Sequence, residues 1–143
     1  MLTYDRQQQC SLLGKFFEAA GAAGFSGRPF VDGYMKSETA AHFFLDYDRL
    51  QWAGGPYMME EFLEASGLQP GSKPGPTNPE ALFWTGYVYR WWGYLTGETP
   101  VEINRQATAA EMFAAWEGYH TLGVEEAIER LREESREKER TCA

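Results

Sequence analysis

The chain has 143 residues, of which 43% are hydrophobic and 24% are charged, and its formal net charge is −8. This length and composition are typical of one folded domain with a substantial hydrophobic core, and they exclude a disordered or fibrous protein. The negative balance argues against nucleic acid or an anionic membrane surface as a direct partner, because Lys and Arg provide most contacts to phosphate groups. It is compatible with a protein partner that has a basic surface.

The first 66 residues predict four helices that end at recognisable caps and breakers. These helices are expected over about residues 4–20, 27–35, 38–50 and 56–66. Ser26 and Ser37 are suitable N-cap residues for the second and third helices. Pro56 in the first turn and Gly67 after the last turn delimit the fourth.

Residues 67–79 contain four prolines and three glycines, so this segment is expected to be a loop. Beyond it, Asn78, Thr99 and Thr108 provide further cap signals, and the final apolar stripe ends at Leu131. The sequence therefore predicts an all-α fold, a compact bundle of about six to eight helices. Residues 1–131 are expected to form a single domain, and residues 132–143 a charged C-terminal extension.

The stretch "GYVYRWWGYLTG", residues 86–97, is unusually rich in aromatic side chains. It contains Tyr87, Tyr89, Trp91, Trp92 and Tyr94. Because residues 82–95 are apolar or aromatic nearly all round, this segment is expected to be the central helix of the bundle. Gly86 and Gly93 share one face, where a neighbouring helix could approach closely. Arg90, if buried, requires a carboxylate or backbone carbonyls; the candidate carboxylates are Asp46, Asp48 and Glu111.

The cysteines and the hydropathy pattern predict where the protein resides. Cys10 and Cys142 lie near opposite ends and form neither a disulfide framework nor a metal-binding pair, so we expect a cytoplasmic protein. The first residues lack the basic and apolar regions of a signal peptide. The longest apolar run is too short to cross a bilayer and is interrupted by Arg90, so no membrane association is expected.

No catalytic, metal-binding or phosphate-binding motif is found, and neither an enzymatic activity nor a cofactor is expected. His42 has Glu38 and Asp46 one turn away on either side, which predicts a solvated ion pair, with an acid/base or metal role as the alternative. His120 lies between two helices, where an imidazole commonly satisfies backbone groups at a helix end.

Two groups of residues are candidate binding sites. The first is an acidic surface with aromatic residues among the carboxylates, suited to anchoring on a basic protein surface. It consists of Asp46, Asp48, Trp52, Tyr57, Glu60, Glu61 and Glu64. The alternative is an ordinary solvated face. The second group would line the pocket of a small-ligand-binding protein or enzyme; it consists of Tyr87, Arg90, Tyr94 and His120. A DNA-binding regulator would need a basic recognition helix, which the sequence lacks.

The C-terminal half resembles a known family. The patterns "GYVYRWWGYLTGE", "EINRQA" and "GYHTLGVEEAIERL", within about residues 84–131, are similar to those of small uncharacterised bacterial proteins associated with toxin–antitoxin-like gene neighbourhoods. The resemblance implies an antitoxin or inhibitor that neutralises a protein partner such as a toxin. It implies no role for individual residues. The expected function is therefore that of a non-enzymatic protein-binding module.

Overall fold

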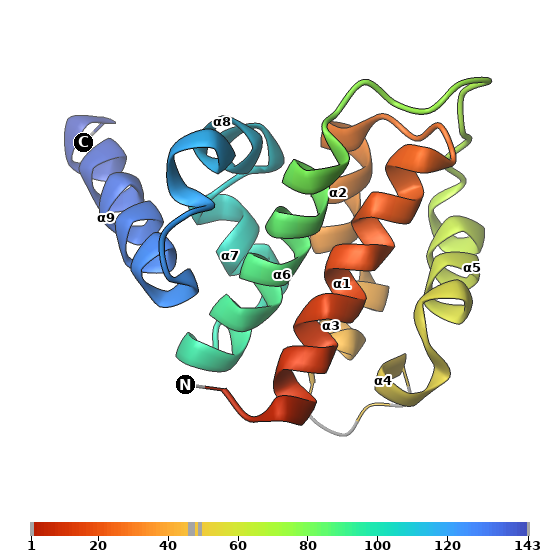
Figure 1. Ribbon diagram of the computed structural model, residues 1–143, viewed down its shortest axis with the longest axis horizontal. Coiled ribbons are helices and arrows are strands. Elements are labelled where there is room, and N and C mark those ends of the chain that lie inside the picture. The colour runs from red at the N-terminus through yellow and green to blue at the C-terminus, as the bar shows by residue number, and fades with distance from the viewer. Residues whose placement is uncertain (1, 46–47, 49, 143) are drawn as a thin grey trace.

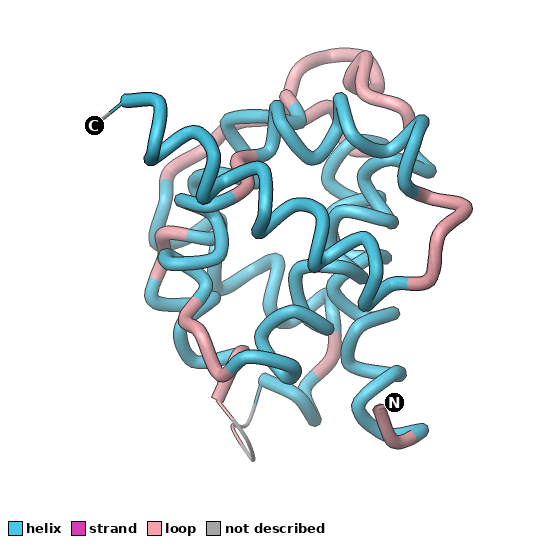
Figure 2. Tube along the Cα trace, turned by 90° about the vertical axis from the view of Figure 1, so that its left-hand side faces the viewer, coloured by secondary structure: helices cyan, strands magenta, loops and turns pink. Residues whose placement is uncertain are grey.

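The computed structural model describes residues 2–45, 48 and 50–142, and within these residues the chain forms helices, turns and loops without strands (Figures 1 and 2). The helices are α1 (Tyr4–Ala22), α2 (Gly27–Met35), α3 (Glu38–Phe43), α4 (Leu50–Ala53), α5 (Gly55–Ser66), α6 (Pro79–Thr96), α7 (Pro100–Gln106), α8 (Ala109–Tyr119) and α9 (Val124–Cys142). The expected all-α class is confirmed.

Helix α6 is the centre of the bundle, as its apolar surface predicts. It runs antiparallel to α1 through the middle of the molecule and also contacts α7, α8 and α9 (Figure 1). A Cβ atom added at Gly86 would lie 2.6 Å from the carbonyl oxygen of Leu13, so the two helix backbones approach closely at this glycine. The same atom added at Gly93 would instead meet the ring of Phe44, at 2.9 Å.

The core is an aromatic cluster built mainly from α1, α2 and α5. The buried rings of Phe16, Phe17, Phe30, Tyr34 and Phe62 pack with centroid separations from 4.9 to 6.4 Å. All of these pairs are tilted or edge-to-face, arrangements that aromatic quadrupoles favour over face-to-face stacking. Burying these rings fixes α2 and α5 against the α1 side of the bundle.

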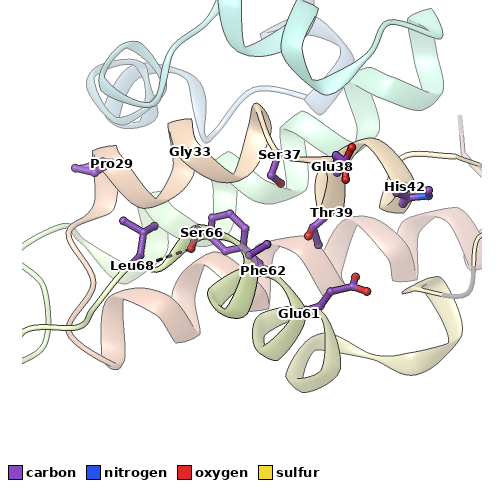
Figure 3. Close-up of a pocket in the computed structure, with 11 residues that line it drawn as sticks. Pro29, Gly33, Ser37, Glu38, Thr39, His42, Glu61, Phe62, Ser66 and Leu68 are labelled. Carbon is purple, nitrogen blue, oxygen red and sulfur yellow. Dashed lines mark hydrogen bonds between the residues drawn. The ribbon is translucent and has the colours of Figure 1, made fainter.

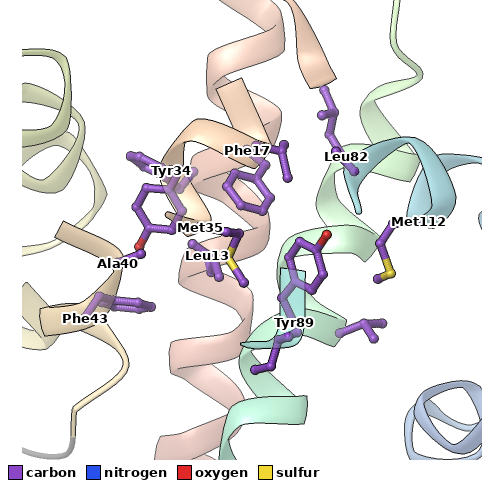
Figure 4. Close-up of a cluster of buried hydrophobic side chains, with 14 of the residues drawn as sticks. Leu13, Phe17, Tyr34, Met35, Ala40, Phe43, Leu82, Tyr89 and Met112 are labelled. Atoms are coloured by element: carbon purple, nitrogen blue, oxygen red, sulfur yellow. The ribbon is translucent and has the colours of Figure 1, made fainter. Parts of the chain in front are cut away.

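A polar network joins α2, α6, α7 and α8 beside this core. The hydroxyl of Tyr89, which Figure 4 shows facing Met112, donates to the carbonyl oxygen of Ala107 at 2.6 Å. Asp32 accepts hydrogen bonds from Asn104 Nδ2 and from the backbone N–H of Ala109, both at 2.9 Å. Burial raises the pKa of Tyr89, so its phenol remains a neutral donor.

The caps expected in the second half of the chain are present. Asn78 accepts a hydrogen bond from the N–H of Glu80 at the start of α6, while Thr99 and Thr108 form complete capping boxes at α7 and α8. Gly97 ends α6 with a φ of 76°, a left-handed conformation that favours glycine.

Residue Glu98, directly after α6, connects the end of this helix to α7. Its carboxylate accepts hydrogen bonds from Trp92 Nε1 at 2.9 Å and Gln106 Nε2 at 2.6 Å. Burial alone would raise the pKa of Glu98, but these hydrogen bonds hold it below its usual value. The carboxylate is therefore ionised near neutral pH.

The loop at residues 67–79 is tied to the end of α1. The N–H of Gly71 donates to the carbonyl oxygen of Gly24 at 2.7 Å, and the N–H of Gly75 donates to that of Gly21 at 2.8 Å. The prolines prevent this segment from forming a helix or strand, so its backbone groups need other partners. These two hydrogen bonds provide such partners. The loop therefore packs back on the bundle.

Two helix boundaries differ from those expected. The helix predicted to reach about Leu50 ends at Phe43, and α4 begins separately at Leu50, whose N–H donates to Asp48 Oδ1 at 3.0 Å. A local Asp cap thus replaces a continuous helix. This additional helix brings the described residues to nine helices, one above the expected range. Residues 46, 47 and 49 of the helix predicted to reach about Leu50 lie outside the described residues.

The other difference is at the C-terminus, where α9 continues to Cys142 although its apolar stripe ends at Leu131. Ion pairs line this last segment. Arg136 pairs with Glu133 at 3.1 Å, and Lys138 contacts Glu111 of α8. Charge pairs of this kind give modest support to a helix that has little apolar surface to bury.

Candidate functional site

A hollow of about 640 Å³ lies between α2–α3 on one side and α5 on the other (Figure 3). We call it the α5 groove. The α2–α3 wall consists of Pro29, Gly33, Ser37, Glu38, Thr39 and His42. The opposite wall consists of Glu61, Phe62, Ala65, Ser66 and Leu68. Its volume is within the range of ligand-binding clefts in proteins.

The two ends of the α5 groove differ in chemistry. Figure 3 shows Pro29 and Leu68 at one end, whereas Glu38, His42 and Glu61 lie toward the other. Phe62 lies between them and is buried in the aromatic core, which holds this wall in place. The groove therefore presents apolar surface at one end and carboxylates from two different helices at the other.

His42 lies at the acidic end, and its imidazole is 60% exposed. Its Nδ1 is 3.3 Å from Oδ2 of Asp48, the carboxylate whose other oxygen caps α4. The sequence predicted an ion pair for His42 with Glu38 and Asp46 as neighbours. The structure shows Asp48 as a partner, while Asp46 lies outside the described residues.

The acidic face of α5, which we define as Tyr57, Glu60, Glu61 and Glu64, occupies about 100° of the helix surface. Tyr57, Glu60 and Glu64 are exposed, while Glu61 is half-buried. Glu61 also lines the α5 groove, so the acidic face is continuous with the groove. The structure thus brings four residues of the predicted acidic surface together on one helix.

The remaining residues of that predicted surface are placed differently. Trp52 is 76% exposed and lines a second hollow, of about 420 Å³, with Arg6 and Gln9 of α1 and Tyr94 of α6. Asp48 is directed toward His42 and the start of α4. The described residues of the acidic surface expected from the sequence are therefore separated: four lie on the acidic face of α5, Trp52 lines the second hollow, and Asp48 contacts His42 and Leu50.

Arg90 lies inside the core, where it is 1% exposed. Its guanidinium carbon is 3.7 Å from the centre of the Tyr94 ring and 4.7 Å from that of Phe44, and its Nη2 donates to the Phe44 carbonyl oxygen at 3.3 Å. These contacts are cation–π interactions and a backbone hydrogen bond that stabilise a buried cation. The contacts of Arg90 are therefore those of a side chain packed in the core.

Of the other members of the predicted pocket, Tyr94 contacts Arg90, whereas Tyr87 and His120 have other neighbours. Tyr87 packs against Phe83 and Trp91, and burial raises its pKa. His120 is exposed at the end of α8, where its ring stacks on Trp116 at 4.4 Å and its Nδ1 lies 2.6 Å from the Trp116 carbonyl oxygen. The expected contact of His120 with a helix-end backbone group is confirmed.

Sequence reasoning did not identify the α5 groove. Glu38 and His42 were expected to belong to a solvated ion pair, and Pro29, Gly33 and Leu68 carried no functional signal. A groove between helices depends on how α2–α3 and α5 pack, which their separate apolar patterns do not specify. Each of the two helices has a small residue at the groove, Gly33 in α2 and Ala65 in α5, but a small residue alone does not distinguish a groove from a close helix contact.

Within residues 2–45, 48 and 50–142, no three His, Cys, Asp or Glu side chains are grouped so that they could hold a metal ion. In the same part of the chain, no helix combines the length and apolar character needed to span a bilayer.

Comparisons with known proteins give no match to a protein-family model, to a curated protein or to a solved structure.

Proposed function

We propose that this protein is a non-enzymatic binding module that recognises a basic surface on another protein through the acidic face of α5. The observation that carries the proposal is the continuity of this face with the α5 groove through Glu61. Exposed carboxylates beside a concave surface provide charge complementarity and shape at one place.

The charge of the whole chain supports the same proposal. With a net charge of −8, the protein attracts basic surfaces over distances of about 10 Å at moderate salt. Tyr57, which is 44% exposed among the glutamates, provides the kind of aromatic side chain that is enriched in interface hot spots. The carboxylates would accelerate association, and the tyrosine would contribute to the lifetime of the complex.

We further propose that the partner is neutralised or regulated by this contact, as an antitoxin or inhibitor acts on a toxin. This part of the proposal is supported by the resemblance of residues 84–131 to proteins from toxin–antitoxin-like neighbourhoods. A cytoplasmic location, proposed from the use of cysteine, agrees with such a role.

The test is affinity capture of the partner from the native cells with matched charge variants. Glu60→Lys combined with Glu64→Lys reverses charge on the acidic face of α5. Glu137→Lys combined with Glu139→Lys makes the same change in net charge on α9, at the opposite side of the molecule (Figure 1).

One protein that is captured by the wild type and by the α9 variant, but lost with the α5 variant, is the expected result. Its release as salt rises from about 0.1 M to about 1 M would follow from the shortening of the Debye length from about 10 Å to about 3 Å. A partner retained equally by both variants would refute a role for the acidic face of α5.

A further inference from the structure

We infer that the α5 groove receives a segment of the partner in which an apolar side chain lies beside a Lys or Arg. This inference rests on the protein-binding function proposed above and adds the chemistry of the segment. It follows from the different character of the two ends of the groove, which one amphipathic basic segment would match (Figure 3).

The apolar end of the groove has room and exposed hydrocarbon surface. Pro29 is exposed and Leu68 is half-buried at this end, and the buried Phe62 lies between this end and the acidic one. An aliphatic side chain placed here would lose water from both its own surface and that of the groove, which favours binding. A purely polar segment would gain nothing at this end.

The other end of the groove favours a cation. Glu38 of α3 and Glu61 of α5 contribute carboxylates from opposite walls of the groove. A partly enclosed carboxylate interacts with a cation more strongly than one on an open surface, because less water screens the pair. The groove therefore selects a basic segment over an acidic one by charge.

Gly33 provides a way to close the groove without disturbing the core. It lies in α2 on the groove wall, and a Cβ atom added there would meet nothing within 4 Å. The same is true of Gly118, which is exposed in α8 and does not line the groove. Gly33→Phe and Gly118→Phe thus make the same change of side chain in a helix, but only Gly33→Phe fills the groove.

The experiment measures binding of three fluorescent peptides of equal length by fluorescence anisotropy. One alternates Lys and Leu, one alternates Lys and Ser, and one alternates Glu and Leu. For the wild type we expect the Lys/Leu peptide to bind about tenfold more tightly than the Lys/Ser peptide, since a single buried Leu is sufficient for this ratio. The Glu/Leu peptide should not bind.

The Gly33→Phe variant should lose at least about tenfold in affinity for the Lys/Leu peptide, while Gly118→Phe should bind as the wild type does. Backbone amide resonances of Gly33 and Ser66, on opposite walls, should shift when this peptide binds the wild type. Equal affinity of the Gly33→Phe variant and the wild type, or equal affinity for the Lys/Leu and Lys/Ser peptides, would overturn the inference.

The same variants separate this inference from the function on which it rests. If Gly33→Phe retains the cellular partner and the double Lys substitution at Glu60 and Glu64 loses it, the partner binds the acidic face of α5 outside the groove, and only the groove inference fails. If neither change weakens capture, both fail. Loss of the partner with Gly33→Phe and with the double Lys substitution, but not with Gly118→Phe, supports both.

Discussion

Replacing Gly86 by Ala should destabilise the protein, although the same replacement normally strengthens a helix. Gly→Ala in a helix interior gains about 0.5–1 kcal/mol, because alanine loses less backbone entropy on folding. At Gly86, however, the new Cβ would lie 2.6 Å from the carbonyl oxygen and 2.7 Å from the carbonyl carbon of Leu13. Both atoms belong to the backbone of α1, so no side-chain rotation can relieve the contact.

The size of the effect follows from the distance that the helices would have to move. Ordinary van der Waals contact of a Cβ begins at 3.4 Å, so a separation of 2.6 Å requires a local shift of about 0.8 Å. Overpacking of this kind costs about 1–3 kcal/mol, and the α1–α6 contact at the centre of the bundle favours the upper part of that range. After the gain in helix propensity, Gly86→Ala should lose about 2 kcal/mol of unfolding free energy.

Urea unfolding followed by far-UV circular dichroism would measure this loss, with Gly33→Ala as the matched control. Gly33 is also inside a helix, but its added Cβ meets open space, so that variant should gain about 0.5–1 kcal/mol. The two variants should therefore differ by about 3 kcal/mol, with unchanged slopes of the unfolding curves. A Gly86→Ala protein as stable as Gly33→Ala would refute the close backbone contact of α1 and α6.

Three further predictions concern the core and the polar network. Because the pKa of Glu98 is lowered in the folded state, its contribution to stability should be present above about pH 4.3 and lost as the pH falls below that value. The unfolding free energy of a Glu98→Gln variant should therefore fall less on acidification than that of the wild type. Urea unfolding at a series of pH values would measure this difference, and an equal loss in both proteins would contradict the prediction. Burial raises the pKa of the Cys10 thiol to about 12. In a Cys142→Ser variant, Ellman's reagent at about pH 8 should therefore label Cys10 only after unfolding. Rapid labelling of the folded protein would show that Cys10 is not buried. Asp32→Ala should cost about 1–3 kcal/mol in the same unfolding assay, since the N–H of Ala109 loses its acceptor, and an unchanged midpoint would show that this bond contributes nothing.

The helix ends show how far local sequence determines this fold. Asn78, Thr99 and Thr108 each accept a hydrogen bond from a backbone N–H two or three residues ahead, and Gly97 ends α6 by adopting a positive φ. These interactions involve neighbours along the chain, so the residue types alone predict them. The apolar character of residues 82–95 likewise predicted a central helix, because such a segment must be covered on all sides.

Where local signals competed, the sequence was a weaker guide. The helix after Ser37 was expected to reach about Leu50, but it ends at Phe43, and the Asp48 carboxylate accepts a hydrogen bond from the first residue of a separate helix. At the C-terminus, the loss of the apolar stripe after Leu131 suggested that the helix fades, whereas ion pairs along and between helices accompany it to Cys142. In both places the local preference for a helix was weak. Contacts of similar energy therefore decided where the helix ends.

The amino-acid sequence by itself determined the helical class, the caps, the central position of α6 and the acidic character of α5, since each depends on residue types at short, regular spacing. Only the tertiary structure decided that Arg90 lies against Phe44, a residue 46 positions away, and that Glu38 and Glu61 line opposite walls of one groove. The physical reason is that helix formation is governed by neighbours three and four residues apart, whereas a groove is the space left when distant helices bury their apolar faces against a common core.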